Sequence, residues 1–144
     1  ADLQRLHGEF KRPPEGLLKL IGRRHVRDNN SWMHNYRRLV KGRDRCTLLM
    51  HPHDMAHRDI ENGKLVTLSS RAGSVQVPAE ACKDMMPGVV SLPHGYGHNR
   101  PGIRMDIAEA HAGVSSNDVT DELALDELSG NAVLNGVPVT VVAS

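Results

Sequence analysis

Aromatic side chains are scarce in this chain of 144 residues, which has one Trp, one Phe and two Tyr. A chain of this length can bury a core as a single domain, so that core must be built from Val, Leu, Ile, Met and Ala. No apolar run approaches the ~20 residues that span a bilayer, and no signal-peptide pattern opens the sequence. Its first residues resemble a cut inside a longer protein, so the missing signal does not decide the compartment of the parent protein. We expect the cytoplasm.

Cysteine is also rare, and the common motifs of catalysis are missing. Cys46 and Cys82 are expected to behave as small buried hydrophobes, and a disulfide between them is the alternative. The sequence has no P-loop and no dinucleotide-binding Gly-x-Gly-x-x-Gly after a strand. Ser91, His94 and Asp106 supply the residue types of a catalytic triad, but no nucleophile elbow fixes their geometry. We therefore expect the chain alone to be inactive as an enzyme.

Positive charge is concentrated near the start of the chain. Residues 1–45 carry a net charge of +7, and residues 46–144 carry −6. A nucleic-acid arm is one interpretation of such a segment, but no interleaved aromatic set accompanies it, and the acidic remainder disfavours nucleic acid. Arginine also binds phosphate oxygens of a nucleotide. A solvated basic surface is the third interpretation.

The chain from Thr47 to Pro93 has the clearest structural pattern. Apolar residues before Pro52 predict a strand and then a short helix over residues 52–60. Alternation on both sides of Arg71-Ala72-Gly73 predicts a hairpin. Further expected elements are strands over Leu17–Arg24 and Val137–Ala143, a loop or short helix over Val26–Tyr36, and short helices over Met105–His111 and Thr120–Leu128. Periodicity alone indicates a small β-rich barrel or sandwich.

A series of short motifs within this stretch is more specific: Pro52-x-Asp54, Arg58-x-Ile60, Gly63-x-x-Val66, Ser70-x-x-Gly73-x-Val75 and Pro87-Gly88-Val89-Val90. In order and spacing they resemble the C-terminal domain of molybdopterin oxidoreductases, the family of DMSO reductase, formate dehydrogenase and nitrate reductase. The resemblance runs from about Lys19 to Val142. It implies an all-β fold with short helices, a double-psi β-barrel of six to seven strands.

The same resemblance implies a function. The domain would bind and orient molybdopterin guanine dinucleotide, while the molybdenum is held by another domain. We expect residues 1–16 to be a flexible lead-in from a preceding domain and residues 17–144 to form the dinucleotide-binding barrel. The N-terminal domains of the same parent enzyme would be its partners, and the isolated chain would be a monomer without a membrane span.

Three polar segments match places where the family contacts its cofactor. The first, Gly22–Asn35, offers guanidinium, amide, hydroxyl and imidazole groups within fourteen residues. The resemblance implies contacts from Arg24, His25, Asn30, Ser31, Trp32 and Asn35. From the residues alone, a capped helical turn with a buried Trp32 is the alternative.

The second segment, Ser91–His98, contains two glycines that allow a ligand to approach the backbone closely. The resemblance implies contacts from His94, Gly95 and His98. In the third, Asn117-Asp118-Val119-Thr120, it implies that Asn117 faces the pterin, and a helix N-cap at Asn117 is the alternative. Because these segments lie far apart in sequence, a single site requires them to meet at one end of the barrel.

The histidines raise a metal interpretation. His51, His53 and His57 are spaced so that three imidazoles can face one side. In the family pattern these are ordinary surface positions, so the sequence predicts no metal site. A barrel of the same type that binds protein, such as a substrate-recognition domain of an ATPase, or nucleic acid, is the alternative to cofactor binding.

Overall fold

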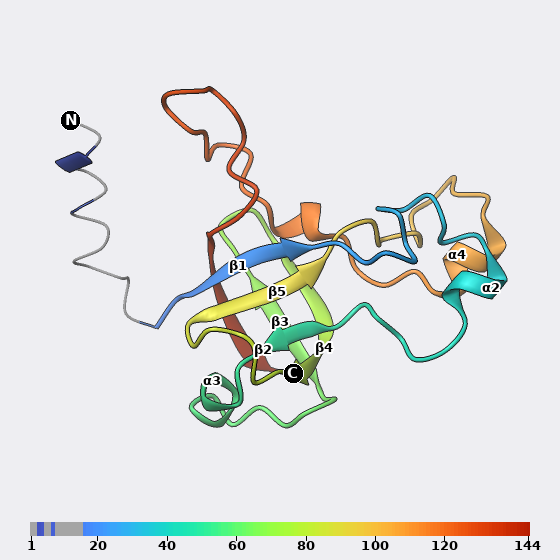
Figure 1. The fold of residues 1–144 in the computed structure, drawn as a ribbon, viewed down its shortest axis with the longest axis horizontal. Coiled ribbons are helices and arrows are strands. Elements are labelled where there is room, and N and C mark those ends of the chain that lie inside the picture. The colour runs from blue at the N-terminus through green and yellow to red at the C-terminus, as the bar shows by residue number, and fades with distance from the viewer. Residues whose placement is uncertain (1–2, 5–6, 8–15) are drawn as a thin grey trace.

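The structure, a computed structural model, describes residues 3–4, 7 and 16–144. The predicted lead-in over residues 1–16 therefore lies largely outside the described residues. Six strands of the described chain close into a barrel in the order β1-β5-β2-β4-β3-β6 (Figure 1). They are β1 (Leu18–Arg23), β2 (Leu48–Met50), β3 (Leu65–Ser69), β4 (Ser74–Ala81), β5 (Val89–Pro93) and β6 (Val137–Ala143). The predicted all-β double-psi barrel of six to seven strands is confirmed, with six.

Alternate side chains of the strands fill the barrel. On β3, Val66 and Leu68 are fully buried, while Thr67 between them is only partly buried. Leu48 and Met50 of β2 are buried in the same way. Burying one such aliphatic side chain contributes roughly 1.5–3 kcal/mol. The core is aliphatic, as the scarcity of aromatic residues predicts.

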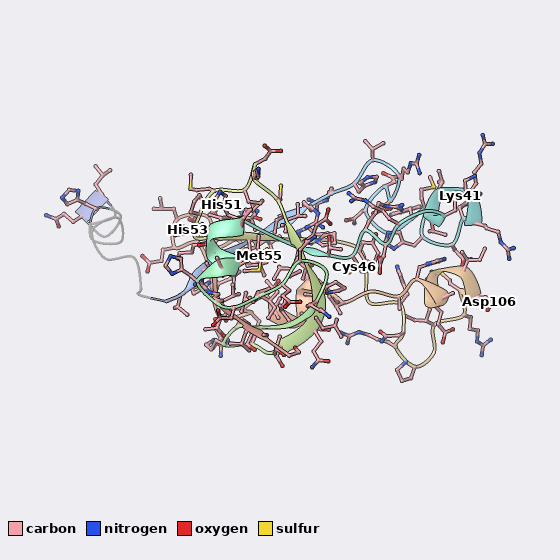
Figure 2. The ribbon with its side chains drawn as sticks, turned by 90° about the horizontal axis from the view of Figure 1, so that it is seen from below. Lys41, Cys46, His51, His53, Met55 and Asp106 are labelled. Carbon is pink, nitrogen blue, oxygen red and sulfur yellow. The ribbon has the colours of Figure 1, made fainter. Side chains whose placement is uncertain are left out.

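The parallel pair β1 and β5 decides where the functional loops lie. Lys19 pairs with Val89 and Arg23 with Pro93, so both strands end at the same edge of the barrel. The segments that follow, residues 24–47 and 94–115, leave the barrel together and form a lobe with α2 (Arg37–Val40) and α4 (Asp106–Ala110). In Figure 2, Lys41 and Asp106 of this lobe lie at the opposite end of the molecule from His51 and His53.

Most predicted short elements are present with shifted ends. The helix at Pro52 is α3 (Pro52–Ala56), which is shorter than predicted, and α4 confirms the helix expected over Met105–His111. Between Val26 and Tyr36 the backbone makes successive turns. The prediction did not include α2 or the 3-10 helix η1 (Ser116–Val119).

The predicted helix over Thr120–Leu128 is wrong. Oδ1 of Asp121 accepts a hydrogen bond from the backbone N–H of Leu123, a local contact that competes with helix formation. Leu125 then bridges to Ala132 in an antiparallel pair. The segment is therefore a turn and a loose hairpin.

Both cysteines are free, so the disulfide alternative is wrong. Sγ of Cys46 accepts a hydrogen bond of 3.3 Å from the N–H of Val114. Burial raises the pKa of Cys46 to about 11, so this thiol is protonated at neutral pH. Within the part of the chain that the structure describes, no helix has the length and apolar character to cross a membrane.

Candidate functional site

A hollow of about 400 Å³ lies where the chain leaves β1 and β5, next to η1. We call it the rim hollow. Seven of the ten residues predicted for the site line it: Arg24, Asn30, Ser31, His94, Gly95, His98 and Asn117. All three polar segments therefore meet at one place. The sequence interpretation did not include four further lining residues, Tyr96, Ser115, Ser116 and Leu134.

Glycine allows the first two loops to pack directly against each other. A Cβ atom on Gly95 would lie 2.0 Å from the carbonyl oxygen of Asn30, and one on Gly22 would lie 1.9 Å from Nε2 of His94. Gly95 also has a φ of 91°, which other residues rarely adopt. Asn29 and Asn30 have positive φ as well, which Asn tolerates better than most residues.

His94 is held between the loops. Its backbone N–H donates to the carbonyl of Arg23, and its Nδ1 lies 3.0 Å from Oγ of Ser116. Burial, followed by the nearby Arg24 guanidinium, lowers the pKa of His94, so the ring is neutral at pH 7. The hydroxyl that it meets belongs to Ser116 and not to Ser91, which is buried in β5, so the triad of Ser91, His94 and Asp106 gains no support.

Asn117 lies in η1 with an exposed side chain. The N-cap of η1 is Ser115, whose side chain accepts from the N–H of Asn117 at 3.3 Å. The alternative that Asn117 is itself the N-cap is therefore wrong. Asn117 lines the rim hollow together with Ser116.

Three predicted residues do not line the rim hollow. Nδ1 of His25 accepts from the N–H of Arg27, and the indole of Trp32 is 79% exposed, which also excludes the alternative of a buried Trp32. Oδ1 of Asn35 accepts from the N–H groups of Ile107 and Ala108, and so caps α4 from the other segment of the lobe. Cofactor contact by these three residues stays a prediction.

Beneath the rim hollow lies a buried polar cluster that the sequence interpretation missed. We call it the Asp28 cluster, and it consists of Asp28, His34, Arg45, Tyr96 and His98. Asp28 is 2% exposed. Its Oδ1 accepts from Nη2 of Arg45 at 2.7 Å, and its Oδ2 accepts from the Tyr96 hydroxyl at 3.1 Å. The cluster joins both segments of the lobe, because Asp28 and Tyr96 lie 68 positions apart.

These contacts fix the charges. Burial acts to raise the pKa of Asp28, but the hydrogen bonds from Arg45 and Tyr96 outweigh it and hold that pKa below its ordinary value. Burial and the adjacent carboxylate raise the pKa of Tyr96. At neutral pH, Asp28 is therefore an anion, Arg45 a cation and Tyr96 a neutral donor. No single sequence motif marks such a set.

The histidines near α3 form a surface group. Nδ1 of His51 accepts from the N–H of His53, and the Nε2 atoms of His53 and His57 lie 3.1 Å apart. Among the described residues, no group of three or more His, Cys, Asp or Glu is arranged to hold a metal ion. The His53 and His57 side chains form an exposed pair on the surface.

We expect zinc to leave the melting temperature of this chain unchanged. A ligand raises stability only when it binds the folded state more strongly than the unfolded state, and an exposed histidine pair offers too few ligands for a closed site. Differential scanning fluorimetry with and without zinc measures this. A zinc-dependent rise that is abolished when His51, His53 and His57 are all replaced by Ala would reverse the conclusion.

Comparison with known proteins identifies the family of this chain. Residues 18–138 match the family model described as Molydopterin dinucleotide binding domain. The chain is 29% identical over 138 residues to the molybdopterin-containing subunit of arsenate respiratory reductase from Chrysiogenes arsenatis, a match that covers 90% of this chain and 16% of the relative. It is 26% identical over 109 residues to a tetrathionate reductase subunit of Salmonella typhimurium, covering 64% of this chain and 11% of the relative.

A solved structure extends the comparison to the fold. Acetylene hydratase from Pelobacter acetylenicus matches 94% of this chain and 20% of its own chain with a TM-score of 0.76, at 18% sequence identity. At this identity the likeness shows a shared fold. The chain thus spans only a small part of the length of the proteins that it matches.

Proposed function

Because this chain belongs to the Molydopterin dinucleotide binding domain family, we propose that its rim hollow holds the pterin end of a molybdopterin guanine dinucleotide. The observation that carries the proposal is the meeting of seven predicted residues from three distant segments at one hollow. Its volume of about 400 Å³ lies within the usual range of about 300–1,000 Å³ for ligand sites. The whole dinucleotide is larger than this, so the hollow takes one part of it.

The lining residues fit a flat heterocycle with attached anionic groups. The amides of Asn30 and Asn117 each combine donors with an acceptor, as the edge of a pterin or purine ring does. The Arg24 guanidinium matches phosphate oxygens. His94, held by its hydrogen bond to Ser116, adds a neutral imidazole to these amides and the guanidinium. These residues bind and orient the ligand, and Gly95 brings the backbone close to it.

The redox chemistry is supplied by the cofactor when it is bound. We propose that the chain is the C-terminal domain of a larger molybdopterin oxidoreductase, whose N-terminal domains supply the molybdenum ligand and the other wall of the site. The names of the two curated relatives, an arsenate respiratory reductase and a tetrathionate reductase, support a redox enzyme. The isolated chain then binds its ligand without turnover. The family match does not favour the alternative of a protein- or nucleic-acid-binding barrel.

We expect a stable pterin or a guanine nucleotide to bind the rim hollow weakly, because only one wall of the site is present. In a titration followed by nuclear magnetic resonance, the amide signals of Arg24, Asn30, Ser31, Gly95 and Asn117 shift together with one dissociation constant. Arg24→Gln should weaken binding by about tenfold or more, since a hydrogen bond to a charged partner contributes about 1.5–3 kcal/mol, and Asn117→Ala by about fivefold, since a neutral one contributes about 1 kcal/mol.

Matched controls come from the same surroundings. Arg27 follows Arg24 on the same loop and Asn99 follows His98, both are exposed, and neither lines the rim hollow. Arg27→Gln and Asn99→Ala should therefore leave binding unchanged. Amide shifts confined to the separate hollow lined by Asp59, Leu65 and Ser144 would contradict the proposed site.

A further inference from the structure

Two buried histidines connect the rim hollow to the Asp28 cluster. His98 is 8% exposed and lines the hollow, and His34 is 3% exposed behind it. Nδ1 of His34 lies 2.6 Å from Nε2 of His98. Two nitrogens at this distance share one proton, so one ring donates and the other accepts. The protonation of His34 therefore decides which hydrogen atoms His98 carries.

The other nitrogen of His34 indicates the direction of this bond. Nε2 of His34 is buried and has no hydrogen-bond partner among the described residues. It lies 3.7 Å from Oδ2 of Asp28, which is too long for a hydrogen bond but close for charges inside a protein. The carboxylate favours a proton on this nitrogen over a lone pair. Neutral His34 then carries its proton on Nε2 and accepts from His98 at Nδ1.

His98 consequently presents a lone pair to the hollow. Its Nε2–H is donated to His34, so its Nδ1 is the acceptor of the ring. His98 itself lines the rim hollow, so this acceptor is offered to a ligand there. A ring N–H of the ligand is the group that such an acceptor binds.

We propose that His34 fixes the tautomer of His98, so that Nδ1 of His98 accepts a hydrogen bond from a ring N–H of the ligand in the rim hollow, an inference that rests on the proposed pterin site. The Nε2–H of His98 is donated to Nδ1 of His34, and no proton leaves the ligand. His34 is a positioning residue, because it acts on the ligand through His98.

The surroundings keep His34 neutral. Burial lowers the pKa of His34, and His98 adds to this, while Asp28 opposes it and the pKa stays below its ordinary value. His34 is therefore uncharged at pH 7 and keeps a lone pair on Nδ1 for the N–H of His98. The other charged or titratable groups near His34 are Arg45 and Tyr96 of the cluster and Arg43, Asp44 and His111, which line a neighbouring hollow with it.

The first test needs no variant and no ligand. Nuclear magnetic resonance of the chain with ¹⁵N-labelled histidine identifies which ring nitrogens carry protons. At pH 7 we expect both His34 and His98 to carry theirs on Nε2. A proton on Nδ1 of His98 at pH 7 would overturn the proposal, whatever binds in the hollow.

A second test uses His34→Phe, which keeps a ring against Tyr96, whose centroid lies 4.4 Å from that of His34, but accepts no proton. In His34→Phe the proton of His98 is no longer held on Nε2, so ¹⁵N signals should show a proton on Nδ1 of His98 at pH 7. The dissociation constant of a pterin should rise several-fold, since a neutral hydrogen bond contributes about 1 kcal/mol, and the exposed His111→Phe should leave it unchanged. An unchanged dissociation constant and an unchanged tautomer in His34→Phe refute the proposal.

The two tests separate the two proposals. If the tautomers are as expected but no pterin or guanine nucleotide binds, the proposed function fails and the histidine pair stands as a property of the fold. If the ligand binds at the rim hollow but His98 carries its proton on Nδ1, the tautomer proposal fails and the binding site stands. If His34→Phe does not fold, the histidine tautomers of the wild-type chain decide the matter.

Discussion

Replacing Arg45 by Met is expected to lower the free energy of unfolding by about 3–5 kcal/mol, the usual cost of removing one partner from a buried ion pair. Asp28 is 2% exposed and its Oδ1 depends on the Arg45 guanidinium. Without that group, the buried carboxylate keeps, among the described residues, only the hydrogen bond from the Tyr96 hydroxyl. Urea unfolding at pH 7, followed by circular dichroism, measures the difference.

The pH dependence of this loss has a definite sign. In the wild-type chain the pKa of Asp28 is below its ordinary value, so Asp28 stabilises the fold above the unfolded pKa of about 3.9 and this contribution is lost as pH falls through the folded pKa. In Arg45→Met burial alone raises the folded pKa. The penalty then shrinks as pH falls from 7 toward 4, so the two stability curves approach each other.

A surface ion pair supplies the control. Arg71 is paired with Asp121 and Glu122 on the exposed side of the hairpin. Exposed pairs contribute little because water and salt screen them, so Arg71→Met should have a small effect that added salt reduces further. If Arg45→Met were as mild as Arg71→Met, or if its deficit did not shrink in acid, Asp28 would not be a buried anion held by Arg45.

Gly95→Ala is expected to be the second severe change. A side chain at φ 91° costs roughly 1–2 kcal/mol, and the new Cβ would lie 2.0 Å from the carbonyl oxygen of Asn30. Forcing the two loops apart adds about 1–3 kcal/mol. Because both residues line the rim hollow, ligand binding should be lost together with stability. Thermal unfolding and the pterin titration measure the two effects.

Gly102→Ala isolates the backbone-strain part of that effect. Gly102 has the same φ of 91°, but a Cβ there meets nothing within 4 Å. Its replacement should cost only the backbone strain and leave ligand binding intact. Equal losses in the two variants would mean that the contact between Gly95 and Asn30 does not hold the loops together.

The strands could be predicted because their signals are local. Val66 and Leu68 alternate with polar neighbours, and Pro52 marks the start of α3 directly after β2. Neither pattern depends on residues elsewhere in the chain. The family motifs added the order of these elements, and through it the barrel and the residues of the three polar segments.

The sequence predictions failed where a competing local contact or a distant partner decided the structure. Thr120–Leu128 has helix-forming residues, but Asp121 caps a turn and Leu125 pairs with Ala132. Asn35 was assigned to the ligand as one of several amides in a polar loop. The structure uses it to cap α4, which lies more than 70 residues away in sequence.

The sequence by itself determined an aliphatic β-barrel, a donor-rich first loop and the family, because these follow from composition, alternation and motif order. Only the tertiary structure decided that the loops after β1 and β5 meet, since their meeting depends on parallel pairing across the barrel. The same closure brings Asp28 to Tyr96 and His34 to His98, over separations of 68 and 64 residues. Such partners stand at no fixed separation in the sequence, because the fold of the chain between them brings them together. No sequence pattern can therefore reveal them.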